Sequence, residues 1–164
     1  MARIYLGTPF FNEEQKKRVA IAQRLLKQNP TVTDFHFPFD YQYKGASVVD
    51  HKGDLFGSLE WQVATYRNDM NAMGQADIGV FLYDLDNIDD GCAFEIGALR
   101  QAQKPVVTIF CGNHEHYSLN LMIAQGSNMM LTDKEALNDT NDNSLAKIDF
   151  NHIINTPVAP YPVF

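Results

Sequence analysis

Short apolar runs alternate with helical patterns along the first two thirds of the chain, and this alternation limits the folds available to it. The clearest example is a strand-like run over 78–83, followed by a helix predicted over 91–103 and a second strand-like run over 105–111. Strands separated by helices of this length are typical of βαβ units, in which the strands run parallel. The pattern therefore predicts the α/β class, with a parallel sheet flanked by helices.

The remaining segments extend the same pattern. The other predicted elements are a strand over 3–7, a helix from about 13 to 29, a strand over 35–39, a long loop over 40–54, a helix over 58–74, a short helix over 120–124 and a strand over 128–131. About five parallel strands result, as in flavodoxin-like and Rossmann-like domains. Asn12 and Gln15 have capping-box spacing, and Pro38 should end regular pairing of the second strand. The Pro-rich C-terminal end suits either an ordered extended arm or a frayed terminus.

Composition favours one domain over residues 1–164, because 45% of the residues are hydrophobic. No apolar run reaches membrane-spanning length and the chain starts directly in a strand, so we expect a cytoplasmic protein without membrane contact. The formal net charge of −7 excludes the basic surface that nucleic acid polymers require. Cys92 and Cys111 are too few for a disulfide framework, and we expect free thiols.

Three loops should meet at one crevice, because ligands of open parallel sheets bind beyond the carboxyl ends of the strands. These are the loops after Gly7, Tyr83 and Cys111. The first carries Phe10 and Phe11, which suit stacking on a flat ligand, with ordinary core packing as the alternative. Because no glycine-rich phosphate loop follows the first strand, the crevice suits an uncharged heteroaromatic ligand that carries a sugar.

Glu95 is the main candidate for chemistry. It lies in an apolar helical stretch beginning near Gly91, where burying an unpaired charge is unfavourable. The alternative is a glutamate of the first helical turn that interacts with the helix dipole. A capping box would require Cys92 as the N-cap, and cysteine caps helices poorly. Glu95 therefore has a structural partner or lines a cavity.

Asp69 is a second candidate, on the helix predicted over 58–74. An apolar stripe at helical spacing predicts that this helix packs against the rest of the domain; it consists of Leu59, Val63, Tyr66, Met70 and Met73. Helical geometry places Asp69 about 60° from Tyr66, at the edge of the stripe, where it could reach a pocket. The alternative is an exposed aspartate paired with a nearby cation.

Neither histidines nor acidic residues indicate a metal site. Asp84, Asp86, Asp89 and Asp90 lack the ligand spacing of a calcium loop. The segment 114–116 offers two histidines without a third ligand in view. We expect loop solvation for most of these aspartates, with Asp89 or Asp90 pointing inward, and we predict no metal and no cofactor.

Taken in order, five segments resemble the nucleoside 2-deoxyribosyltransferase family. They are Ile4-Tyr5-Leu6-Gly7 with Phe10-Phe11, residues 40–45, residues 61–69, residues 89–97 and Asn120-Leu121-Met122. Each motif alone is weak, whereas their order along most of the chain is specific. The resemblance implies transfer of 2-deoxyribose from a deoxynucleoside to a free nucleobase.

The resemblance also implies roles for individual residues. The site would consist of the nucleophile Glu95, the assisting acids Asp69 and Asp89, the orienting Tyr5, Gln42 near the base, and Trp61, Phe10 and Phe11 as further substrate contacts. Asn120 and Met122 would complete a neighbouring subunit's site in a homohexamer, a trimer of dimers. Attack by a carboxylate and then by a second base retains configuration, as in retaining glycosidases. We assign proton exchange with the bases to Asp69 and the sugar hydroxyls to Asp89.

Two features depart from a simple family pattern. Family members of this type often end in tyrosine, whereas this chain ends in Phe164. Residues 42–45 resemble forms that accept purines and pyrimidines, but 37–40 and 123–126 resemble purine-restricted forms; we favour broad acceptance. The alternatives are a hydrolase that cleaves the N-glycosidic bond of a deoxynucleoside or nucleotide, and a non-catalytic nucleoside-binding protein.

Overall fold

The computed structural model describes residues 1–46, 54–112, 117–155 and 158–164. Its centre is one parallel sheet of five strands in the order β2-β1-β3-β4-β5. The strands are β1 (Ala2–Gly7), β2 (Val32–His36), β3 (Ile78–Asp84), β4 (Val106–Cys111) and β5 (Met129–Thr132). The predicted α/β fold is confirmed.

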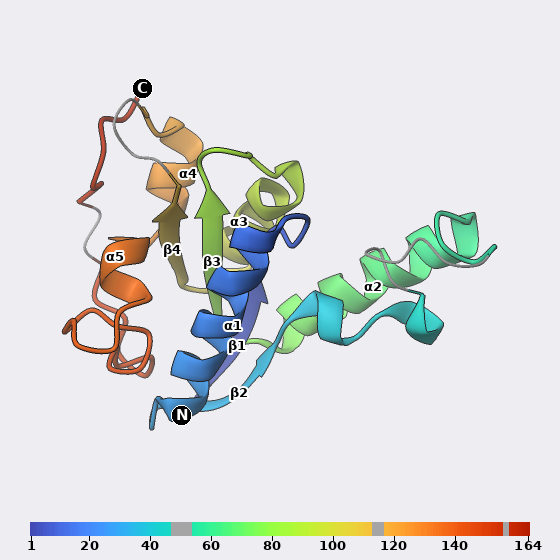
Figure 1. Cartoon of the computed structure of the whole chain (residues 1–164), viewed down its shortest axis with the longest axis horizontal. Coiled ribbons are helices and arrows are strands. Elements are labelled where there is room, and N and C mark those ends of the chain that lie inside the picture. Colours follow the sequence, from blue (N-terminus) through green and yellow to red (C-terminus); the bar gives the residue numbers. More distant parts are fainter. Residues whose placement is uncertain (47–53, 113–116, 156–157) are drawn as a thin grey trace.

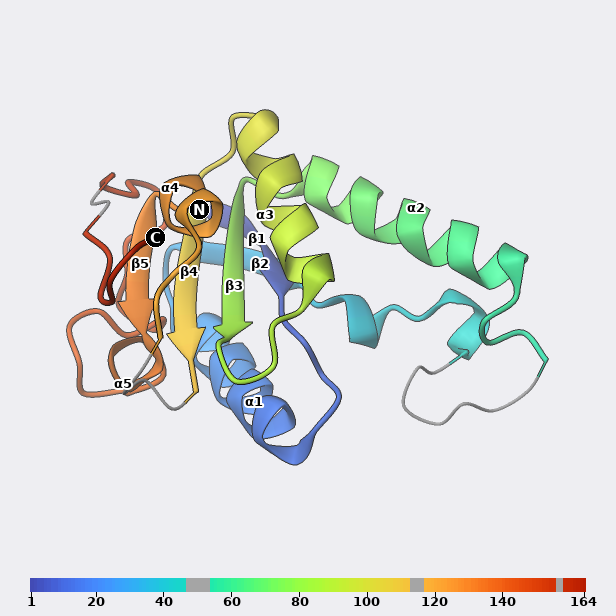
Figure 2. The same cartoon turned by 90° about the horizontal axis from the view of Figure 1, so that it is seen from above.

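Helices cover both faces of this sheet (Figures 1 and 2). They are α1 (Glu13–Gln28), α2 (Leu59–Gln75), α3 (Asp90–Gln101), α4 (Leu121–Gly126) and α5 (Asp133–Ala136), with single 3₁₀ turns η1 (Pro38–Asp40) and η2 (Tyr43–Gly45). Because strand side chains alternate between faces, Ile4 and Leu6 pack on the α1 side, whereas Tyr5 and Phe81 pack on the side of α3. None of the helices described is both long and apolar enough to cross a membrane.

The second strand begins and ends three residues earlier than predicted. It runs over Val32–His36, and Pro38 starts a 3₁₀ turn. Proline fixes φ and lacks an N–H donor, so it stops the strand as expected. The beginning was wrong because β2 is an edge strand with exposed polar residues at Thr33 and Asp34, and an apolar pattern does not reveal such a strand. Part of the loop predicted over 40–54 falls outside the described residues, and the part described contains η2.

Helix α2 corrects the expectation that its whole apolar stripe packs within the chain. Of the stripe, Met73 is buried, whereas Leu59 is 75% and Tyr66 is 55% exposed. Figure 1 shows why, since α2 extends away from the body and only its C-terminal end lies on the sheet. Helical periodicity identifies an apolar face, but it does not identify what covers that face.

The C-terminal end is an ordered extended arm over 158–164. The Leu119 N–H donates to the Pro162 carbonyl at 2.7 Å, and the Phe164 N–H donates to the Leu119 carbonyl at 3.1 Å. The Tyr161 ring meets the Phe110 ring edge-on, with centroids 6.3 Å apart. These contacts decide between the two states that the sequence left open.

Lys104 anchors the C-terminal end of α2. Its Nζ donates to the carbonyls of Met73 at 2.8 Å and Ala76 at 2.6 Å, and also to Gly74. Carbonyls at a helix end lack helical partners and favour a cation. We expect Lys104→Met to lower the free energy of unfolding by about 1–3 kcal/mol, measured by denaturant unfolding. Lys134→Met, which changes an exposed lysine of α5, is the control; equal stability of the two variants would contradict the anchoring role.

Candidate active site

A buried tyrosine and a glutamate meet beneath the carboxyl ends of the strands. The Tyr5 hydroxyl donates to Glu95 Oε1 at 2.7 Å, although the two residues are 90 positions apart in sequence. Tyr5 is fully buried on β1, and strand alternation directs it toward the face that α3 covers. Glu95 therefore has the partner that its apolar surroundings require.

The start of α3 gives Glu95 a different position from the one expected. The helix begins at Asp90, with Asp89 as the N-cap, whose carboxylate accepts from the N–H groups of Gly91 at 3.4 Å and Cys92 at 3.2 Å. Cys92 does not cap the helix, in line with its poor capping ability, and the helix starts one residue before the Gly91 predicted from the sequence. Glu95 then lies in the second turn, where the helix dipole stabilises a carboxylate less.

Burial changes the acidity of both candidate carboxyl groups. It raises the pKa of Glu95 to about 7; the hydrogen bond from Tyr5 opposes this shift, and the nearby Asp69 and Asp89 add to it. Burial also raises the pKa of Asp69 to about 6. The pKa of Tyr5 rises as well, so this phenol stays protonated and donates. Raised carboxyl pKa values in one cluster are typical of acid–base and nucleophilic sites.

Because Gly7 has no side chain, it leaves space for the Phe81 ring and the Glu95 carboxylate. A Cβ atom at Gly7 would lie 2.2 Å from the Phe81 ring and 3.0 Å from Glu95 Oε2. The sequence predicts this glycine at the end of a strand but gives no sign of its contact with Glu95. No local pattern could have revealed it, since both neighbours come from distant parts of the chain.

The two phenylalanines of the first loop have different environments. Phe10 packs against Phe37 and Phe39, with ring centroids 5.3 and 5.2 Å away. Phe11 is 64% exposed and touches Phe39 edge-on. Core packing, the alternative to ligand stacking, therefore applies to Phe10, while Phe11 remains available to a ligand.

A seam between α2 and residues 36–46 contains polar atoms that lack partners. The Gln42 side-chain N–H donates to the Pro38 carbonyl at 3.1 Å, which leaves Gln42 Oε1 buried and unpaired. Within the described ranges, the other buried side-chain polar atoms without a partner are His36 Nε2, Trp61 Nε1 and Thr65 Oγ1. Leaving such atoms unpaired is unfavourable, so the part of this seam formed by Gln42, Trp61 and Thr65 is suited to a polar ligand. Neither His36 nor Thr65 is among the site residues predicted from the sequence.

Asn120, Met122 and the C-terminal Phe164 lie at a different place. They line a cavity of about 400 Å³ that also contacts Tyr83, and its lining includes neither Glu95 nor Asp69. Asn120 caps α4 by accepting from the Met122 N–H at 2.8 Å, and the Met122 side chain is 76% exposed. Within one chain, Asn120 and Met122 therefore do not line the same cavity as Glu95.

The remaining acidic residues have structural roles or face solvent. Buried Asp84 accepts from the Gln15 amide at 2.8 Å and lies 3.4 Å from the Arg18 guanidinium. Asp86 accepts from the Tyr117 hydroxyl. Across the described part of the chain, no group of three or more His, Cys, Asp and Glu side chains could hold a metal ion. The two histidines at 114 and 116 lie outside that part.

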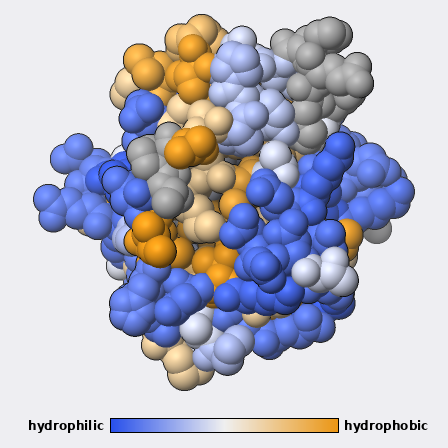
Figure 3. Space-filling model, turned by 90° about the vertical axis from the view of Figure 1, so that its left-hand side faces the viewer, coloured by the Kyte–Doolittle hydropathy of each residue, from blue (hydrophilic) through white to orange (hydrophobic). Residues whose placement is uncertain are grey.

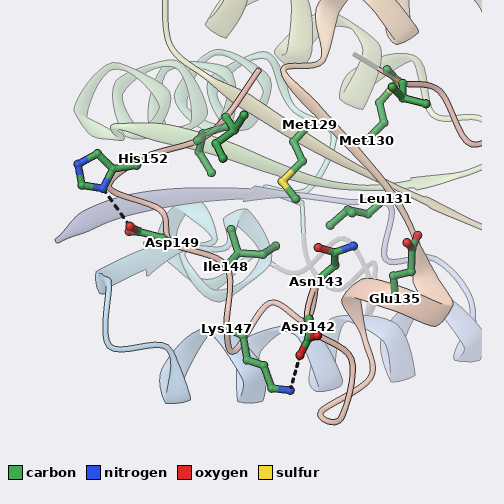
Figure 4. Close-up of a pocket in the computed structure, with 13 residues that line it drawn as sticks. Met129, Met130, Leu131, Glu135, Asp142, Asn143, Lys147, Ile148, Asp149 and His152 are labelled. Atoms are coloured by element: carbon green, nitrogen blue, oxygen red, sulfur yellow. Dashed lines mark hydrogen bonds and ion pairs between the residues drawn. The ribbon is translucent and has the colours of Figure 1, made fainter. Parts of the chain in front are cut away.

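A hollow lined by β5 and the segment that follows α5 lies away from Glu95 and is a poorer candidate for the active site. Figure 3 shows the face that carries α5 and the C-terminal segment, and Figure 4 shows the lining of the hollow. Its volume is about 510 Å³, with Met129, Leu131 and Ile148 among its apolar lining. The charged rim is already paired, since His152 contacts Asp149 at 2.9 Å and Lys147 lies 3.7 Å from Asp142.

The chain has an α/β fold in which Tyr5 and the partly buried carboxyl groups of Glu95 and Asp69 form one cluster. Residues 4–147 match the family model described as nucleoside 2-deoxyribosyltransferase. The chain belongs to this family and is an enzyme of nucleoside deoxyribosyl transfer.

Individual relatives agree with this assignment. A nucleoside deoxyribosyltransferase from Limosilactobacillus fermentum is 45% identical over 99% of this chain and 94% of its own length. Another, from Lactobacillus leichmannii, is 34% identical over 73% of this chain and 76% of its own length. The solved structure of a 2-deoxyribosyltransferase from Bacillus psychrosaccharolyticus has a TM-score of 0.73 and 32% identity, and the match covers 96% of this chain and 99% of that one.

Substituting Gly7 provides a test of the space beside Glu95. We expect Gly7→Ala to lower kcat/KM for deoxyribosyl transfer by about tenfold or more, because the added methyl group must displace Phe81 or the Glu95 carboxylate. Gly97→Ala on α3 is the control, since its added methyl group meets no atom within 4 Å. Steady-state kinetics of both purified variants measure the effect. Turnover by Gly7→Ala equal to that of Gly97→Ala would contradict the packing argument.

Proposed function

We propose that this enzyme transfers 2-deoxyribose between nucleobases through a covalent intermediate on Glu95. The Glu95 carboxylate attacks the anomeric carbon, the C–N bond to the first base breaks, and a glycosyl ester forms. A second base then attacks the same carbon, and the carboxylate leaves. Two inversions retain the configuration. The observation that carries this proposal is a partly buried carboxyl group oriented by a 2.7 Å hydrogen bond from Tyr5.

Asp69 is proposed to exchange the proton with both bases. A departing nucleobase needs a proton as its bond breaks, and an incoming base loses one, so a single carboxyl group can serve both half-reactions. The pKa of Asp69, raised to about 6 by burial, supports this role because a carboxyl group with its ordinary pKa of 3.8 would be almost fully ionised near neutral pH, whereas Asp69 keeps a minor protonated fraction. The Asp89 carboxylate accepts only two long capping hydrogen bonds, at 3.4 and 3.2 Å. It is proposed to accept a further hydrogen bond from a hydroxyl group of the sugar.

The reaction is tested with deoxyinosine and adenine, followed by chromatography. Deoxyadenosine together with hypoxanthine is the result expected for transfer. Free deoxyribose would instead identify a hydrolase, and unchanged substrates would identify a binding protein. Thymine and cytosine as further acceptors test the proposal that purines and pyrimidines are both accepted, for which the resemblance of residues 42–45 is the support.

We propose that the working enzyme is a homohexamer with sites shared between subunits. The exposed stripe on α2, with Leu59 and Tyr66, is an apolar surface that a second copy would cover. Asn120 and Met122, which lie away from Glu95 in their own chain, would then complete a neighbour's site. Size-exclusion chromatography with light scattering should show a hexamer, and a monomer at working concentration would contradict the proposal. We place this enzyme in the cytoplasm, where Cys92 and Cys111 would remain reduced.

A further inference from the structure

We propose that His36 is a positioning residue for Glu95, acting through the ring of Tyr5. This inference rests on the proposed role of Glu95 and goes beyond it. His36 lies between two aromatic rings: its ring is stacked on Tyr41, with centroids 4.4 Å apart and planes 15° apart, and on Tyr5, with centroids 6.0 Å apart and planes 14° apart. We call Tyr41, His36 and Tyr5 the ring column.

The sheet register places the two inner rings side by side. Tyr5 on β1 is the direct partner of His36 on β2, and paired residues of adjacent parallel strands point to the same face. Tyr41, which follows η1, covers the outer face of the imidazole. On its other side Tyr5 meets Phe81, with centroids 6.2 Å apart. The Tyr5 ring is therefore held between His36 and Phe81.

This confinement matters because the end of Tyr5 carries the contact with Glu95. The hydroxyl must stay 2.7 Å from Glu95 Oε1 for the hydrogen bond to form. Removing the imidazole would open space on one side of the Tyr5 ring and let the hydroxyl move. Displacements of about 1 Å at a reacting group reduce rates by up to about a hundredfold.

The imidazole is suited to stacking because it remains uncharged. Its Nε2 atom is buried without a partner, so protonation would leave a buried cationic N–H unsatisfied. Burial accordingly lowers the pKa of His36, although Asp34 and Asp40 act in the opposite direction. The ring thus contributes its shape and flat faces, and a phenyl ring could replace it.

A double-mutant cycle between His36→Ala and Tyr5→Phe tests the inference, with His36→Phe as the matched control. We expect His36→Ala to lower kcat by about tenfold or more relative to the wild type, with little change in KM. His36→Phe, which keeps a flat ring at this position, should have a kcat close to that of the wild type. In the Tyr5→Phe background, which lacks the hydroxyl, His36→Ala should have no further effect. An equal loss of kcat in both backgrounds, or failure of His36→Phe to restore it, would overturn the inference.

A second measurement is independent of turnover and separates this inference from the proposed reaction. Because the Tyr5 hydrogen bond lowers the pKa of Glu95, the pKa of Glu95 from carboxyl ¹³C NMR should rise in His36→Ala and stay unchanged in His36→Phe. Tyr41→Ala removes only the exposed outer ring and should give a smaller rise. An unchanged pKa of Glu95 in His36→Ala would overturn the ring column's role, whereas absence of transfer by the wild type would overturn only the proposed reaction.

Discussion

Replacing Glu95 by glutamine is expected to lower deoxyribosyl transfer by at least about a thousandfold and to make the protein more stable at pH 8. An amide cannot replace a carboxylate as the nucleophile, so the covalent route is lost. The same substitution removes a carboxyl group that the fold buries, with a pKa raised to about 7. Activity and stability should therefore change in opposite directions.

The stability effect has a definite pH dependence. The folded protein binds the Glu95 proton more tightly than the unfolded chain, whose carboxyl group has its ordinary pKa of 4.5. Stability of the wild type therefore falls as pH rises from about 4.5 to about 7, and the penalty is complete above that range. At pH 8 glutamine should add on the order of 2 kcal/mol to the free energy of unfolding, and at pH 4 almost nothing.

Thermal or denaturant unfolding of both proteins at pH 4 and pH 8 measures this difference. The control is Glu14→Gln, because Glu14 is exposed on α1 and pairs with Lys17 at 2.7 Å; it should leave transfer unchanged and bring no stability gain at pH 8. A Glu95→Gln protein that retains transfer, or that gains equal stability at both pH values, would contradict the assignment.

Replacing Asp69 by asparagine should reduce transfer in a way that depends on the leaving base. For ordinary purine deoxynucleosides we expect a loss of about 10²- to 10⁴-fold in kcat, since the departing base no longer receives a proton. Donors with a good leaving group need no such assistance and should lose far less. Single-turnover rates with both kinds of donor measure the contrast, and equal losses on both would argue against proton transfer by Asp69.

The pH profile provides a second measure of the same role. Forming the glycosyl-enzyme requires ionised Glu95, with a pKa of about 7, and protonated Asp69, with a pKa of about 6. Asp69 has the lower pKa, so as the pH rises it loses its proton before Glu95 does. Only a small fraction of the enzyme therefore has Asp69 protonated and Glu95 ionised at the same time, and kcat/KM should peak between pH 6 and 7. Asp69→Asn should remove the decline above the optimum. Asp142→Asn, a change far from the site on an exposed carboxylate, should keep the wild-type profile.

Sequence patterns predicted an element correctly where the interactions that form it join residues close together in the chain. Asn12 and Gln15 make the predicted capping box at the start of α1, because both partners lie within one helical turn. The strand over 78–83 and the helix after it were recognised from periodicity alone. The same reasoning misplaced β2, whose polar edge carries no apolar signal, and it did not identify Asp89 as the N-cap of α3.

The sequence by itself determined the alternating α/β pattern, the apolar surroundings of Glu95 and the family motifs, because hydrophobic periodicity and short motifs are properties of neighbouring residues. The family motifs implied that Tyr5 orients Glu95. Only the tertiary structure decided the hydrogen bond that joins these two residues, the space that Gly7 leaves for the second oxygen of Glu95, and the stacking of His36 on Tyr5. These contacts join residues that lie 31 to 90 positions apart. They arise from strand order and register, which depend on how the whole chain packs.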